Sequence, residues 1–110
     1  MDIDQNSWKK QTNSDKNATI LDVRTPEEFV ISRIPNSINI DFYNPQIFMQ
    51  EINKLDKNQS YYIYCRTNNR SSKTATILQE NGYRDILVIK GGINEWVKNG
   101  NDINYTKYSE

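Results

Sequence analysis

The chain has 110 residues, a length typical of one domain that buries roughly two-thirds of its unfolded surface without disulfides or metals. Its 14 basic and 14 acidic residues cancel, so no overall field attracts nucleic acid or an acidic membrane, and we expect neither partner. The lack of histidine and the single cysteine argue against a zinc site. One cysteine also excludes an internal disulfide, and the polar N-terminus lacks a signal-peptide pattern, so we expect a cytoplasmic protein.

The N-terminal part predicts an edge strand, a helix, and a strand that leads into a second helix. Residues 2–4 fit the edge strand, and a short helix is expected around Trp8. The apolar and β-branched run at 19–23 predicts the next strand. Residues 25–28 (TPEE) then supply an N-cap, a proline at the first helical position and an acid at N3. The pattern is a strand, a tight turn and a helix.

The middle of the chain continues this alternation. Residues 38–40 predict a short strand, and Asn44 followed by Pro45 opens an amphipathic helix that continues to Leu55. Residues 61–64 predict another strand, which ends directly before the single cysteine of the chain.

The C-terminal part predicts two more helices with a strand between them. A helix is expected from about Ser72 to Glu80, and Asn81-Gly82 ends it, because glycine readily adopts the left-handed conformation that closes a helix. Residues 86–89 form an unbroken apolar strand, the glycines at 91–92 turn the chain, and residues 93–98 predict the last helix.

This order predicts a three-layer α/β fold. Strands that alternate with helices favour a mostly parallel central sheet, here of about five strands, with helices on both faces. We find no linker, so residues 1–110 are expected to form a single domain. Residues 102–110 show no periodicity, and we expect a loose C-terminal tail.

Cys65 directly follows the predicted strand 61–64, at an end of the sheet where strand-to-helix loops gather and ligands bind. The backbone N–H groups of residues 66–71 are expected to turn inward and to add to the positive end of the helix dipole. A helix N-terminus and neighbouring arginines favour the thiolate form of a cysteine. Because the chain has no histidine, this activation has to be electrostatic, which excludes papain-like and caspase-like chemistry.

The alternative for Cys65 is a purely structural role, because unpaired cysteines are among the most buried residue types. Arg66 and Arg70 favour the nucleophile, since arginine is seldom buried without an anionic partner. The two arginines have an alternative of their own, as surface charges or as partners of structural acids such as Asp22. We therefore predict a reactive Cys65 in an anion-binding loop.

Four segments, in order, resemble the rhodanese-like domain family, and the resemblance covers nearly the whole chain. Residues 20–29 (ILDVRTPEEF) look like the family's first signature, and residues 34–40 (IPNSINI) are similar to its I-P-G-A-x-N-I segment. Residues 65–71 (CRTNNRS) are similar to its active-site loop, C-R-S/T-G-x-R-S. Residues 88–96 (VIKGGINEW) look like its closing G-G-x-x-x-W signature.

The resemblance implies a sulfurtransferase whose Cys65 accepts a sulfane sulfur from a small-molecule donor such as thiosulfate and carries it as a persulfide. The sulfur would then pass to cyanide, to a thiol or to a sulfur-accepting protein, and neither a cofactor nor a metal is implied. Asp22 and Arg24 are expected to brace the loop by hydrogen bonds. The implied substrate-binding residues are Arg66, Thr67, Asn68, Asn69, Arg70 and Ser71.

The chain departs from the family pattern at two places. Asn68 stands where the family has glycine, so we expect a positive φ there, which asparagine tolerates best after glycine. Its side chain is expected to narrow the pocket or to add an amide donor. Ser32 and Arg33 replace a Gly-His pair, and Arg33 is expected to add positive charge near the mouth of the site.

Two other functions compete with sulfur transfer. Cysteine-dependent phosphatases place five residues between the cysteine and the final arginine of the loop, whereas only residues 66–69 separate Cys65 from Arg70 here. The shorter loop favours sulfur over phosphorus chemistry. The second alternative is a binding module or persulfide carrier that keeps the fold without turnover, because a fold alone does not establish a function.

Overall fold

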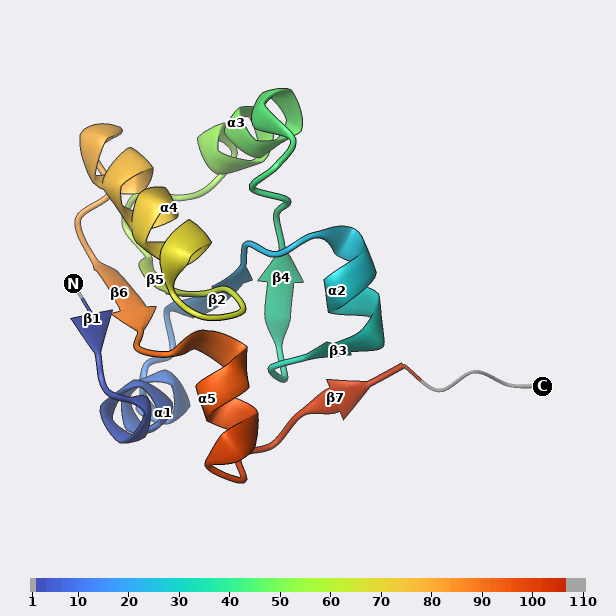
Figure 1. Cartoon of the computed structure of the whole chain (residues 1–110). Helices are drawn as coiled ribbons and strands as arrows, with labels where there is room; N and C mark the ends of the chain where they lie inside the picture. The colour runs from blue at the N-terminus through green and yellow to red at the C-terminus, as the bar shows by residue number, and fades with distance from the viewer. Residues whose placement is uncertain (1, 107–110) are drawn as a thin grey trace.

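The computed structural model describes residues 2–106. Its central sheet has five strands in the order β1-β6-β5-β2-β4, and every neighbouring pair is parallel (Figure 1). The strands are β1 (Asp2–Ile3), β6 (Ile86–Ile89), β5 (Ser60–Tyr64), β2 (Ala18–Asp22) and β4 (Ser37–Asn39). The predicted parallel α/β sheet of about five strands is confirmed.

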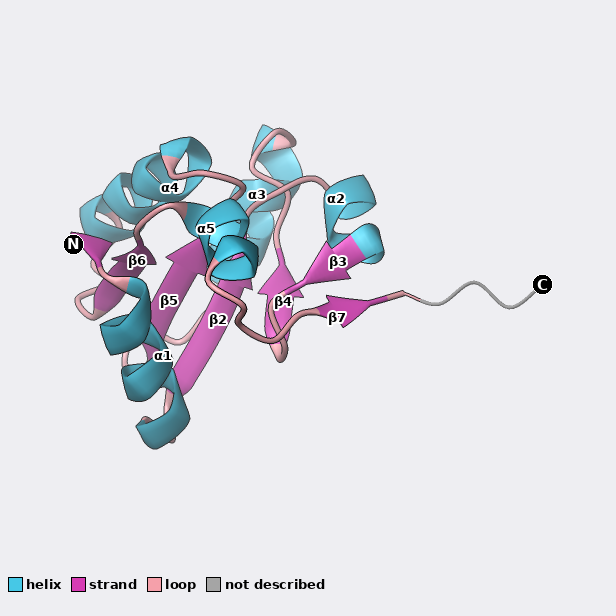
Figure 2. Ribbon diagram, turned by 60° about the horizontal axis from the view of Figure 1, so that its bottom comes forward, coloured by secondary structure: helices cyan, strands magenta, loops and turns pink. Residues whose placement is uncertain are grey.

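Helices cover both faces of this sheet, which confirms the predicted three layers. α3 and α4 lie on one face, and α1 and α5 lie on the other (Figures 1 and 2). The five helices are α1 (Gln5–Ser14), α2 (Pro26–Ile31), α3 (Pro45–Asn53), α4 (Asn69–Glu80) and α5 (Gly92–Lys98). Within residues 2–106, no helix has the length and apolar character needed to cross a bilayer.

The central strand β5 divides the core into two layers, because successive side chains of a strand point to opposite faces. Ile63 and Cys65 pack with the side chains of α3 and α4. Tyr62 and Tyr64 pack on the other face, where Trp8 of α1 is fully buried. Cys65 therefore belongs to the α3 and α4 layer.

Most predicted elements are present, with shifted boundaries. The capping box at the start of α2 forms as expected: the Glu28 backbone N–H donates to the Thr25 hydroxyl, and the Thr25 backbone N–H donates to the Glu28 carboxylate. α4 begins at Asn69, three residues before the predicted Ser72, since the polar first turn of this helix carries no apolar periodicity. The prediction made the loop after Cys65 too long.

The prediction of a loose tail is wrong for residues 102–106. Residues 104–105 form β7 (Asn104–Tyr105), which pairs antiparallel with the short strand β3 (Ser32–Arg33). The Trp96 indole N–H also donates to the Asp102 carbonyl at 2.7 Å. A strand of two residues has too few side chains to show a period, and its partner lies far away in the sequence. Residues 107–110 of the predicted tail lie outside the described residues.

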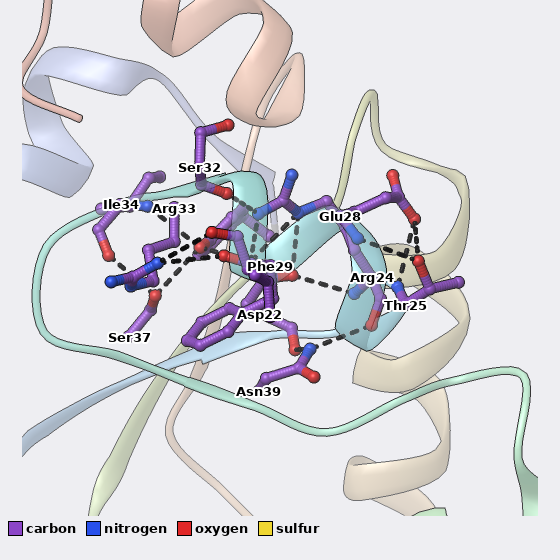
Figure 3. Close-up of polar contacts among 12 residues, drawn as sticks. Asp22, Arg24, Thr25, Glu28, Phe29, Ser32, Arg33, Ile34, Ser37 and Asn39 are labelled. Carbon is purple, nitrogen blue, oxygen red and sulfur yellow. Dashed lines mark hydrogen bonds and ion pairs between the residues drawn. The ribbon is translucent and has the colours of Figure 1, made fainter. Parts of the chain in front are cut away.

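A buried ion pair lies at the carboxyl end of β2 (Figure 3). Arg24 donates to both carboxylate oxygens of Asp22, with a shortest N–O distance of 2.6 Å, and also to the Ser32 carbonyl at 2.6 Å. The Asn39 amide donates to the carbonyls of Asp22 and Arg24. Burial alone would lower the pKa of Arg24, but the hydrogen bond and charge of Asp22 outweigh it and raise this pKa. The pair ties β2 to β4 and to the segment that follows α2.

Tyr64, the last residue of β5, completes this network. Its hydroxyl donates to Asp22 at 2.6 Å and accepts the Ile34 backbone N–H at 3.1 Å. Burial, followed by the charge of Asp22, raises the pKa of Tyr64, so the hydroxyl keeps its proton and remains a donor. The residue directly before Cys65 is thus anchored to β2.

We expect Tyr64→Phe to destabilise the protein by about 1–3 kcal/mol, because it leaves the buried Ile34 N–H without an acceptor and removes one donor to Asp22. Urea unfolding followed by circular dichroism measures this change. Tyr62→Phe is the matched control on the same strand, since it breaks one part-buried bond to Asp15 at 3.2 Å and should cost less than about 1 kcal/mol. Equal losses in the two variants would contradict the role of the network.

Candidate active site

Cys65 lies at the carboxyl end of β5, both in the core and beside a surface pocket. It is only 1% exposed and packs in the core, yet it also lines a surface pocket of about 340 Å³. Its sulfur lies 3.3 Å from the Ser71 hydroxyl. The other lining residues are Glu28, Tyr43, Arg66, Thr67, Asn69 and Arg70. Cys65 is therefore a core residue that also contributes to the wall of this pocket.

The backbone of the loop begins with two carbonyl groups that accept hydrogen bonds, while its N–H groups have no protein acceptor within residues 2–106. The Cys65 and Arg66 carbonyls accept hydrogen bonds from the backbone N–H groups of Ile93 and Asn94 in α5, at 2.9 and 3.1 Å. Within residues 2–106, no protein acceptor receives a hydrogen bond from the N–H groups of residues 66–71, the last three of which begin α4. The N–H groups of residues 66–71 therefore remain without a protein acceptor.

Gly92 allows α5 to approach the loop this closely. It has a φ of +61°, and a Cβ atom at this position would lie 2.5 Å from the Cys65 carbonyl oxygen and 2.6 Å from that of Arg66. Any side chain would push the loop and the helix apart. The second glycine of the closing signature therefore permits the direct contact between α5 and the cysteine loop.

The expectation of a positive φ at Asn68 is wrong. Its φ is −169°, which any residue adopts, so the replacement of the family glycine costs no backbone strain here. The Asn68 amide donates to the Asp2 carboxylate at 3.0 Å and to the Ser72 hydroxyl at 3.2 Å, and the side chain does not line the Cys65 pocket. It neither narrows that pocket nor adds a donor to it.

The other loop residues differ in what they present to the pocket. Arg66, Thr67 and Asn69 line it and are exposed. Ser71 is buried and does not line it; its hydroxyl contacts the Cys65 sulfur and donates to the Asn68 carbonyl. Within the described chain, no carboxylate forms an ion pair with Arg66. Of the two arginines in the loop, Arg66 is thus the one without a carboxylate partner in the described chain.

Arg70 is bound to Glu28 instead. Its two terminal nitrogens donate to the two carboxylate oxygens at 2.7 and 3.2 Å, a fork that joins α4 to α2. The guanidinium also lies over the exposed Tyr43 ring, 5.2 Å from its centroid. Asp22, which the sequence suggested as an arginine partner, is occupied by Arg24.

The ion pair keeps both partners charged. The hydrogen bond from Arg70 is the main reason that the pKa of Glu28 falls from 4.5 to about 2. The same hydrogen bond raises the pKa of Arg70. The pocket therefore holds a permanent carboxylate as well as two arginines.

Three of the predicted supporting or charged residues do not line the Cys65 pocket. Asp22 and Arg24 form no hydrogen bond with residues 66–71, and they support Cys65 only through the neighbouring Tyr64. Arg33 does not line the Cys65 pocket; it donates to the Phe29 carbonyl at the end of α2, beside the ion pair shown in Figure 3. Arg33 therefore does not place its positive charge at the pocket of Cys65, contrary to our expectation from the sequence.

Sequence reasoning missed Glu28 and Tyr43 as pocket residues. Glu28 had a complete local explanation as the N3 residue of the capping box, and no local pattern marked Tyr43. Only the fold brings α2 and the segment before α3 to the cysteine loop.

We expect Gly92→Ala to cost more stability than Gly100→Ala, although both glycines have positive φ, +61° and +76°. Gly100 has no neighbour within 4 Å, so its substitution carries only the backbone cost of about 1–2 kcal/mol. Contact with the loop carbonyls should add at least about 1 kcal/mol to Gly92→Ala. Urea unfolding of both variants measures the difference, and equal values would contradict the close approach of α5.

We expect the Glu28–Arg70 pair to lose its stabilising effect in acid. A carboxylate whose pKa is lower in the folded state stabilises the fold fully at pH values above its unfolded-state pKa, here near 4.5. This stabilisation is lost as the pH falls through the folded-state pKa of about 2. Near neutral pH, Glu28→Gln should cost about 1 kcal/mol. The difference in unfolding free energy between wild type and variant, measured across this range, should shrink toward zero. A constant difference would contradict the assignment, because the other acids are common to both proteins.

Comparison with known proteins agrees with this geometry. The model of the rhodanese-like domain matches residues 5–99. A protein named sulfurtransferase from Allochromatium vinosum is 30% identical over 99 residues, covering 90% of this chain and 90% of that protein. A protein named thiosulfate:glutathione sulfurtransferase from Saccharomyces cerevisiae is 30% identical, with 80% of this chain and 70% of that protein covered.

Longer proteins and solved structures also match. A tRNA uridine(34) hydroxylase from Pelagibacter ubique is 33% identical over 97 residues, but these span only 32% of its length. The crystal structure of a rhodanese-related protein from Thermoplasma volcanium has a TM-score of 0.80 and 27% identity, covering 96% of this chain and 98% of that one. The family model covers most of the chain, and the fold and loop agree with it, so this chain belongs to the rhodanese-like domain family.

Proposed function

We propose that the chain is a sulfurtransferase in which Cys65 accepts and passes on a sulfane sulfur as a persulfide. The observation that carries the proposal is that Cys65 lines a pocket together with Arg66, at the start of a loop whose backbone N–H groups have no protein acceptor within residues 2–106. N–H groups in this arrangement stabilise an anion next to the sulfur. The relatives named as sulfurtransferases support the same chemistry.

The reaction has two steps. The Cys65 thiolate attacks the outer sulfur of the donor, the donor's S–S bond breaks, and its electron pair leaves with the remaining fragment, which is sulfite if the donor is thiosulfate. The persulfide on Cys65 then gives its outer sulfur to cyanide or to a thiol, which restores the thiolate. The free N–H groups of residues 66–71 stabilise the negative charge of the persulfide between the two steps.

Five residues of the loop have a part in this proposal. Arg66 attracts an anionic donor, since no carboxylate compensates its charge. Thr67 and Asn69 border the donor, and Arg70 shapes the pocket through its bond to Glu28. Ser71 orients the Cys65 sulfur from within the core. No metal or cofactor takes part in these steps, and a cytoplasmic location stays a prediction.

We expect incubation with thiosulfate to add the mass of one sulfur atom to the protein and cyanide to remove it, with release of thiocyanate. Intact-mass spectrometry detects the gain and the loss. Cys65→Ser should abolish both, since a hydroxyl does not replace the thiolate as nucleophile. Ser72→Ala is a matched control, because Ser72 contacts Asn68 outside the pocket and its loss should leave sulfur loading unchanged.

The same experiment separates a catalyst from a carrier. With both substrates present, a catalyst forms thiocyanate at a steady rate far above the uncatalysed reaction, whereas a carrier, which loads too slowly to turn over, forms no more than the uncatalysed reaction does. An unchanged mass with thiosulfate and with alkyl persulfides would contradict sulfur transfer. Hydrolysis of an aryl phosphate without any sulfur loading would support phosphatase chemistry instead.

A further inference from the structure

We propose that Glu28 is a specificity-determining residue that disfavours dianionic sulfur donors and directs Cys65 toward donors with a single negative charge, namely alkyl persulfides. This inference rests on the proposed function of Cys65 and names the donor class that its pocket selects. It assigns to Glu28 a role beyond the helix cap and the ion pair.

The position of Glu28 is the first argument. Its carboxylate lines the same pocket as Cys65, and both of its oxygens accept hydrogen bonds from Arg70, at 2.7 and 3.2 Å. The Arg70 side chain is 12% exposed and that of Glu28 is 27% exposed, so the pair lies in the wall of the pocket and not on an open surface. Two of the N–H groups of Arg70 are therefore used before any donor arrives.

The balance of charge in the pocket is the second argument. Its charged side chains are Glu28, Arg66 and Arg70, and the reactive form of Cys65 adds a second negative charge. The two arginines are thus matched by two anions once the thiolate has formed. A donor with two negative charges therefore meets side chains whose charges sum to zero, although the family loop with two arginines suggests a strongly positive pocket.

The third argument is that Glu28 does not lose its charge under working conditions. The hydrogen bond from Arg70 is the main cause that lowers the pKa of Glu28 to about 2. The carboxylate is therefore ionised at neutral pH and well below it. The selection acts constantly and is not a pH switch.

The two donor classes differ in the charge that the site must accept. Thiosulfate is a dianion; when the Cys65 thiolate takes its outer sulfur, the S–S bond breaks and the electron pair leaves as sulfite, also a dianion. An alkyl persulfide anion carries one charge, and the same bond cleavage releases one thiolate. Because electrostatic energy scales with charge, the Glu28 carboxylate repels the first donor about twice as strongly as the second.

Glu28→Gln tests the inference with little disturbance of the fold. Glutamine has nearly the same shape and also serves at N3 of a capping box, so the start of α2 is kept while the charge is removed. Glu27→Gln is the matched control: it removes the same charge from the same helical turn, but Glu27 is exposed and does not line the Cys65 pocket. Circular dichroism and thermal unfolding establish that both variants are folded.

The measurement is the single-turnover rate of sulfur addition to Cys65, followed by intact mass at low ionic strength, with thiosulfate and with hydroxyethyl persulfide as probes. Glu28→Gln should raise the second-order rate about tenfold for thiosulfate and about threefold for the persulfide, because the logarithm of the effect scales with donor charge. Glu27→Gln should change either rate less than about twofold. Added salt should reduce the gain for thiosulfate.

The inference is overturned if Glu28→Gln changes both rates by the same factor, lowers both, or acts no more strongly than Glu27→Gln. A uniform change would mean that Glu28 only positions Arg70, because loss of position affects both donors alike. Failure of the proposed function has a different signature: neither wild type nor variant takes sulfur from either donor, and this result overturns both proposals together.

Discussion

The contact between the N-terminus of α5 and the backbone of Cys65 and Arg66 is the constraint on which the site depends. A loop that leaves a parallel strand presents both carbonyl groups, which favour cations, and N–H groups, which favour anions. Here α5 binds the two carbonyls, so the N–H groups of residues 66–71 are the ones left for a ligand. The close approach requires a residue without a side chain at Gly92. The preference for anions that the proposed function requires therefore depends on the packing of α5 against the loop as well as on the loop itself.

Two ion pairs have different parts in this structure: Asp22–Arg24 lies at the end of β2, and Glu28–Arg70 joins α2 to α4. Asp22 and Arg24 are almost fully buried, and such a pair is tolerated only when its remaining hydrogen-bonding groups are satisfied, as Tyr64, Ser32 and backbone groups do here. This pair holds the strand ends in place and has no access to the pocket. The pair of Glu28 and Arg70 lies in the pocket wall and sets its charge. The pair of Asp22 and Arg24 thus helps to position Cys65 through Tyr64, and the pair of Glu28 and Arg70 contributes to the charge of the pocket beside Cys65.

Glu28 connects the start of a helix to the electrostatics of the site. The same carboxylate accepts the Thr25 backbone N–H of the capping box and the guanidinium of Arg70. Through Glu28, one side chain both caps the start of α2 and contributes a negative charge to the pocket. A site with two arginines in its loop is consequently less positive than its sequence suggests, and Arg66 supplies most of its attraction for anions.

The sequence by itself determined the order of strands and helices, the capping box at 25–28 and the place of Cys65 at a strand end, because these features depend on neighbours within a few residues. Only the tertiary structure decided the pairing of Arg70 with Glu28, the bonding of the loop carbonyls by α5, the ordinary φ of Asn68 and the pairing of β7 with β3. Each of these joins segments that are distant in the chain or depends on the path of the backbone between them. Local patterns indicate which element a residue belongs to, but the sheet order and the packing of the helices decide which residues meet.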